Sequence, residues 1–62
     1  MEEVTKESFY KIIGPLDVIS SVVGDYPYTS IFRMRYGKEV GRHIDSYPEN
    51  GVHPIVSRFF IV

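Results

Sequence analysis

Residues 28–46, YTSIFRMRYGKEVGRHIDS, decide the fold, because they predict a β-hairpin in the middle of the chain. The hairpin carries four of the seven Lys and Arg residues of the protein: Arg33, Arg35, Lys38 and Arg42. A strand pair of this length presents its side chains in a fixed geometry. We therefore expect a binding partner to contact the protein here.

The length of the hairpin connection sets which residues face one another. A two-residue connection would place Phe32 and Met34 on the same face as His43 and would scatter the apolar residues over both faces. A three-residue connection, 35–37, with Gly37 in the left-handed region, gathers them on one face. The pairs expected from it are Phe32 with Val40, Tyr28 with Ile44 and Arg33 with Glu39. We expect a helix to dock on the face that carries Tyr28, Phe32, Met34, Val40 and Ile44.

Arg42 is the exception on that apolar face. An arginine on a buried face needs a carboxylate partner or must extend to the rim. We expect it to pair with an acid such as Glu7 or Asp17, and the alternative is a functional contact with an anion.

A short helix is predicted from Lys6 to Ile13. Thr5 is a good N-cap, and Val4 before it can pack on Phe9. Gly14 in a left-handed cap and the following proline end the helix. Its apolar stripe consists of Phe9, Ile12, Ile13 and Leu16. We expect this stripe to pack on a sheet, because so short a helix is unstable alone.

Two further strands are predicted, at 17–23 and at 55–62. The C-terminal strand is apolar on both faces, so it is either an interior strand or a covered edge. A covered edge would give a homodimer by strand pairing, and both alternatives remain open. The fold class expected is α+β in one domain, 1–62, with a short N-terminal helix packed on an antiparallel sheet of three to four strands.

Composition narrows the class of protein. The chain has 62 residues, no cysteine and a net charge of -1, with an acidic first part and a more basic second part. A small secreted domain would usually need disulfides, so we expect a cytoplasmic protein. The acidic, polar N-terminus does not resemble a signal peptide, so we expect none, and no apolar run approaches the roughly 18 residues of a membrane span.

No catalytic motif is recognisable in the chain. The conceivable metal ligands are His43, Asp45 and His53, which form a weak set because the third lies in a loop. We expect neither enzymatic activity nor a metal or cofactor.

Two functions of different class fit these observations. The first is a protein-binding module of the regulatory or inhibitory kind, such as those that phages and mobile elements encode. The alternative is a nucleic-acid-binding protein that lays the basic hairpin along a phosphate backbone. The partner-binding residues expected are those of the basic hairpin and the tyrosines of the two Tyr-Pro pairs near its open end: Arg33, Arg35, Tyr36, Lys38, Tyr26 and Tyr47.

Overall fold

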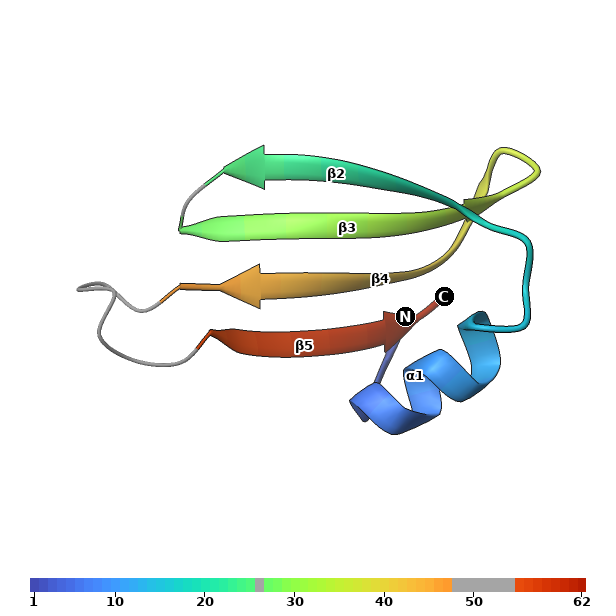
Figure 1. Ribbon diagram of the computed structural model, residues 1–62, viewed down its shortest axis with the longest axis horizontal. Coiled ribbons are helices and arrows are strands. Elements are labelled where there is room, and N and C mark those ends of the chain that lie inside the picture. The colour runs from blue at the N-terminus through green and yellow to red at the C-terminus, as the bar shows by residue number, and fades with distance from the viewer. Residues whose placement is uncertain (26, 48–54) are drawn as a thin grey trace.

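The computed structural model describes residues 1–25, 27–47 and 55–62. They form one antiparallel sheet of five strands with one helix beside it (Figure 1). The elements are β1 (Glu2–Val4), α1 (Lys6–Ile13), β2 (Ile19–Asp25), β3 (Tyr28–Arg35), β4 (Lys38–Ser46) and β5 (Val56–Ile61). The α+β class is therefore confirmed, whereas the expected three to four strands are too few.

The strand missed by the sequence is β1, which has three residues and no pattern of its own. It pairs with β5, and the spatial order of the sheet is β1-β5-β4-β3-β2. Residues 59–61 of β5 therefore have a hydrogen-bonded strand on each side. This position accounts for a strand that is apolar on both faces without a second copy of the chain.

The predicted helix forms with the predicted bounds. The Thr5 hydroxyl accepts a hydrogen bond from the Ser8 amide at 3.1 Å, as an N-cap does. The expected left-handed cap at Gly14 is wrong, because this residue keeps right-handed φ and ψ and donates its N–H to the Tyr10 carbonyl. Pro15 cannot continue this bonding, and the next turn is closed from the Leu16 amide to the Ile13 carbonyl.

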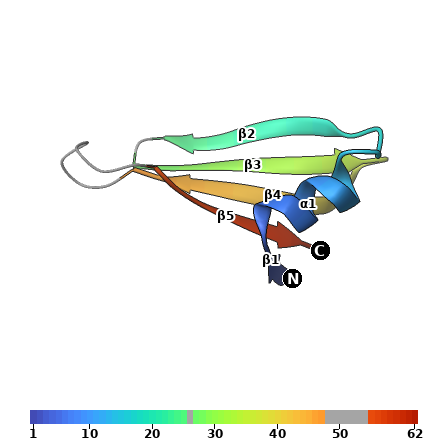
Figure 2. The ribbon, with the colours of Figure 1, turned by 60° about the horizontal axis from the view of Figure 1, so that its bottom comes forward.

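Helix α1 lies against one face of the sheet, on the side of β4, β5 and β1 (Figures 1 and 2). Its buried residues are Phe9 and Ile13, whereas Ile12, expected on the same stripe, is 49% exposed. Phe9 packs on Phe59 of β5 with ring centroids 5.2 Å apart. The partly buried residues around these three are Val4, Leu16, Val18, Val40 and Ile61.

The expected register of the central hairpin is wrong. Arg35 pairs with Lys38, so the connection has two residues, Tyr36 and Gly37, both with positive φ (52° and 76°). Two successive left-handed residues match the twist of the adjoining strands, which is why hairpins with short connections use them. The left-handed conformation predicted for Gly37 is present, but in a shorter connection than we expected.

A register shift between Arg33 and Met34 then changes the pairing along the rest of the hairpin. Val40 is passed over, and the pairs become Arg33 with Gly41, Phe32 with Arg42, Ile31 with His43 and Tyr28 with Ser46. Helix α1 docks on the face that carries Gly41 and His43, and the face of Phe32 and Arg42 has no helix in the described part of the chain. The expected face for the helix is therefore wrong, although Phe32, Arg42 and Ile44 do share a face.

Candidate functional site

The tip of the β3–β4 hairpin gathers three of the predicted site residues: Arg35, Tyr36 and Lys38. The Tyr36 side chain is 88% exposed. The guanidinium carbon of Arg35 lies 5.0 Å from the centre of the Tyr36 ring, a cation-π contact. Lys38 is exposed on the other side of the turn. The tip therefore offers an exposed aromatic ring and the Lys38 cation to a partner, beside the half-buried Arg35, whose Nε is buried without a hydrogen-bond partner among the described residues.

Arg33, the fourth hairpin residue predicted to bind a partner, faces α1 instead of solvent. Its guanidinium carbon lies 5.7 Å from the centre of the Phe9 ring, and its Nη2 lies 3.3 Å from Nδ1 of His43. Its Nη1 atom is buried and has no hydrogen-bond partner among the described residues. These contacts give Arg33 a place in the packing of the helix on the sheet.

The tyrosine end of the hairpin is the opposite end. The Tyr47 amide donates to the Pro27 carbonyl at 2.9 Å, so residues 27 and 47 meet there as expected. Tyr28 next to them is exposed. Tyr26 and His53, which the sequence singled out, and Pro48, the proline of the second Tyr-Pro pair, lie outside the described residues.

The sheet face opposite α1 carries two arginines that are each paired with a glutamate. Arg42 donates to both carboxylate oxygens of Glu39 at 2.6 and 2.7 Å, and Arg58 donates in the same way to Glu3 at 2.9 and 2.7 Å. Their guanidinium carbons lie 4.5 Å from the centre of the Phe32 ring and 5.4 Å from that of Phe60. Arg42 thus has a carboxylate partner, as expected, but the acid is on its own strand.

These ion pairs shift the pKa values of side chains that form them. Hydrogen bonding to Glu39 raises the pKa of Arg42, and hydrogen bonding to Arg58 lowers the pKa of Glu3. Both arginines are therefore matched in charge within the protein, and neither presents an unpaired cation to a phosphate.

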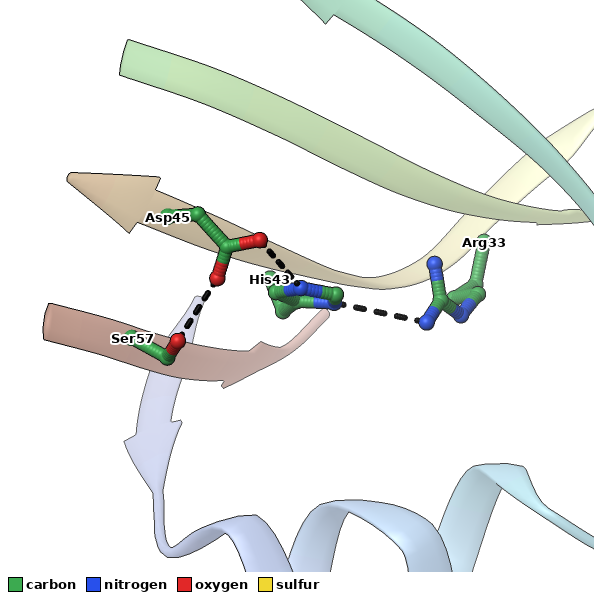
Figure 3. A network of polar contacts seen from close by, with 4 residues as sticks. All are labelled: Arg33, His43, Asp45 and Ser57. Carbon is green, nitrogen blue, oxygen red and sulfur yellow. Dashed lines mark hydrogen bonds and ion pairs between the residues drawn. The ribbon is translucent and has the colours of Figure 1, made fainter. Parts of the chain in front are cut away.

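A polar network that the sequence did not predict lies on the face covered by α1 (Figure 3). It runs from Arg33 to His43, from His43 Nε2 to Asp45 at 3.2 Å, and from the Ser57 hydroxyl to Asp45 at 2.6 Å. The contacts assign the Nε2–H tautomer to a neutral His43, because Nδ1 must accept from Arg33. The signal missed was the register, which moves Arg33 from a position opposite Glu39 to one opposite Gly41, two residues from His43 on β4.

The network is not a nucleophilic triad, although it contains Ser, His and Asp. The Ser57 hydroxyl donates to the carboxylate and not to the imidazole, so His43 is not positioned to take its proton. The His43 ring stacks on Phe59, with centroids 5.1 Å apart. The network therefore holds the imidazole in place beside the core.

The ionisation of Asp45 makes the stability that this network contributes depend on pH. Burial raises the pKa of Asp45, but hydrogen bonds from Ser57 and His43 and the positive charge of Arg33 outweigh that effect and hold the pKa below its usual value of 3.8. A carboxyl whose pKa is lowered by folding stabilises the fold above its unfolded pKa, and this contribution is lost as the pH falls through the folded value.

We expect Asp45→Asn to lower the free energy of unfolding by about 1.5–3 kcal/mol at neutral pH, the contribution of hydrogen bonds to a charged group. The difference from the parent should shrink below about pH 4, where the unfolded carboxyl protonates. Urea melts at pH 7 and pH 3 measure it, with Asp17→Asn, outside the network, as the control. A deficit of the same size at both pH values would contradict this role.

Within the described residues no group of three or more potential metal ligands occurs, and no surface pocket is present. None of the helices in the described part of the chain has the length and hydropathy to cross a membrane. No protein-family model, curated protein or solved structure matches the chain. The function is therefore inferred from the residues themselves.

Proposed function

We propose that the protein is a non-enzymatic, cytoplasmic protein-binding module of the regulatory or inhibitory kind, and that it binds its partner through the tip of the β3–β4 hairpin. The observation that carries this proposal is the conformation of Tyr36. It has a φ of 52° and an almost fully exposed ring.

A left-handed backbone is unfavourable for a bulky residue. At this position of a two-residue hairpin connection, Asn or Gly adopts positive φ at a lower cost, and a strained residue costs on the order of 1 kcal/mol or more. The ring gains little within the fold in return, since it is almost fully exposed and stacks with the Arg35 guanidinium alone among the described residues. A tyrosine that destabilises the fold and exposes its ring is explained if the ring binds a partner.

The chemistry of the tip fits a protein partner. Tyrosine and arginine are enriched among the residues that contribute most to the affinity of protein interfaces. The stacked Arg35 guanidinium and the neighbouring Lys38 favour a partner that surrounds an apolar recess with carboxylates. The tip projects beyond the paired part of the sheet, so a concave surface can receive it.

Nucleic-acid binding is the alternative, and the arrangement of cations favours it less. A protein that follows a phosphate backbone needs a row of unpaired cations. Arg42 and Arg58 are held by carboxylates and Arg33 faces α1, so the row is reduced to Arg35 and Lys38. Two cations beside one ring can contact a nucleic acid at one place, but they cannot follow its phosphate backbone.

We expect Tyr36→Asn to stabilise the fold by about 0.5–1 kcal/mol and to weaken binding of the partner by at least about tenfold. Extracts of the source cells, passed over the immobilised parent and the variant, identify proteins that the parent retains and the variant loses. Calorimetry with the purified partner then gives the affinities, and thermal melts give the stabilities. Tyr28→Thr, an exposed tyrosine at the opposite end of the hairpin, is the matched control.

Full-strength binding by Tyr36→Asn would exclude the tip as the binding site. Retention that disappears after nuclease treatment, with an affinity that falls steeply with salt, would establish the nucleic-acid alternative instead. Loss of binding in Tyr28→Thr alone would move the site to the tyrosine end.

A further inference from the structure

Strand β2 is an edge of the sheet with an unusual surface. It pairs residue by residue with β3 from Ile19 to Asp25 and has no strand on its other side among the described residues (Figure 1). Half of its backbone N–H and C=O groups therefore point away from the sheet. Its exposed apolar side chains lie on both faces: Ile19 at 76%, Val22 at 66% and Val23 at 53% exposure.

The other edge of the sheet is protected and β2 is not. Natural proteins blunt edge strands with charged residues, short length, prolines or bulges. Strand β1 has three residues, two of them Glu2 and Glu3, and the latter is tied to Arg58. Strand β2, ISSVVGD, has seven residues, no proline and no register shift against β3, and its single charge lies at its last residue.

We propose that this edge is an interface between two copies of the chain, which pair β2 with β2 antiparallel about a two-fold axis through Val22. In this register Val22 faces Val22 of the second copy, Ser20 faces Gly24, Ser21 faces Val23, and Ile19 faces Asp25. Like charges do not meet anywhere along the seven pairs. The apolar residues contact each other at the axis, where a two-fold interface is most buried.

Self-complementarity is the reason to choose a second copy as the occupant. A strand without cations and with one carboxylate at its end offers a foreign partner little charge to recognise, but it fits its own reverse without conflict. The net charge of -1 opposes association only weakly. Pairing would join the two sheets edge to edge and cover both sets of open backbone groups.

The dimer would keep both hairpin tips free. Residue 19 pairs with residue 34, so the tip lies beyond the Ile19 end of β2. Antiparallel pairing places the two Ile19 ends, and hence the two tips, at opposite ends of the joined sheet. The interface is therefore independent of the proposed function and would make it bivalent.

Sedimentation equilibrium over a dilution series tests the proposal. We expect the parent to approach twice its 7.2 kDa mass. We expect Val22→Lys to raise the dissociation constant by at least about tenfold, because it places like charges opposite each other at the axis. Val22→Glu alone should do the same, whereas a mixture of the Lys and Glu variants should recover the dimer mass. Circular dichroism confirms that the variants remain folded, as expected for a side chain that is mostly exposed.

Val56→Lys, in the part of β5 that β1 does not cover, is the matched control and should leave the dimer unchanged. A parent that stays monomeric throughout the series would overturn the proposal. So would a dimer that survives Val22→Lys, and loss of the dimer in Val56→Lys alone would assign the interface to the C-terminal strand. Two charged variants that fail to recover the dimer on mixing would reject the two-fold register through Val22.

Discussion

Replacement of Phe9 by alanine is expected to unfold most of the protein at room temperature. Phe9 is the one fully buried large side chain among the described residues, and it contacts Phe59, Tyr10 and the Arg33 guanidinium. Phe→Ala in a core costs about 3–5 kcal/mol, because the lost burial is followed by a cavity. A domain of this size has about that much stability in total.

Urea denaturation followed by circular dichroism measures the effect, and a one-dimensional proton spectrum shows whether dispersed resonances persist. Ile12→Ala is the control, because Ile12 lies on the same helix but on its exposed side. It should cost under about 1 kcal/mol. A Phe9→Ala variant that stays within 1 kcal/mol of the parent would show that α1 is not held by this side chain.

The bounds of α1 could be predicted because local chemistry sets them. A threonine hydroxyl reaches the amide of Ser8 three residues on, and Pro15 cannot donate a hydrogen bond, whatever the rest of the chain does. The extent of the hairpin, Tyr28 to Ser46, could be predicted in the same way from residue preference. Strand β1 could not, because three residues carry too little pattern and take their conformation from β5.

The register of the hairpin depends on information that the pattern of side chains does not contain. A tyrosine with positive φ at the first position of the connection was not expected, since Asn or Gly is favoured there. The shift beside Met34 then passes over Val40 and changes which residues lie opposite each other, while Arg33, Gly41 and His43 share one face. A prediction that gathers the apolar residues under the helix fails here. Phe32 and Phe60 lie on the opposite face, where arginine side chains and not a helix pack over their rings.

The candidate site was predicted in part. The tip residues Arg35, Tyr36 and Lys38 come together because they adjoin one turn, which any register would preserve. Arg33 was assigned to solvent because the helix was expected on the opposite face, whereas α1 covers the face that Arg33 shares with His43. The role of a residue on a sheet face depends on which face the helix covers and could not be predicted, whereas the residues at the turn could.

Gly41→Ala is expected to destabilise the fold by about 1–3 kcal/mol, the usual cost of overpacking a core. A Cβ atom at this position would lie 2.9 Å from the Phe60 carbonyl oxygen, 3.1 Å from Cε1 of Phe9 and 3.3 Å from Cδ1 of Ile13. The first contact is with backbone and cannot be relieved by a change of rotamer. It opposes the gain of about 0.5–1 kcal/mol that alanine would otherwise bring to a strand.

The absence of a side chain at Gly41 is therefore what lets α1 approach the sheet, and a double-mutant cycle separates this contact from other effects. Phe9→Leu removes Cε1, so Gly41→Ala combined with Phe9→Leu should lose less stability than the two single changes together. Coupling between residues in contact is typically 0.5–3 kcal/mol, and denaturant melts of the four proteins measure it. A Gly41→Ala variant as stable as the parent, or strict additivity in the cycle, would mean that α1 does not rest on residue 41.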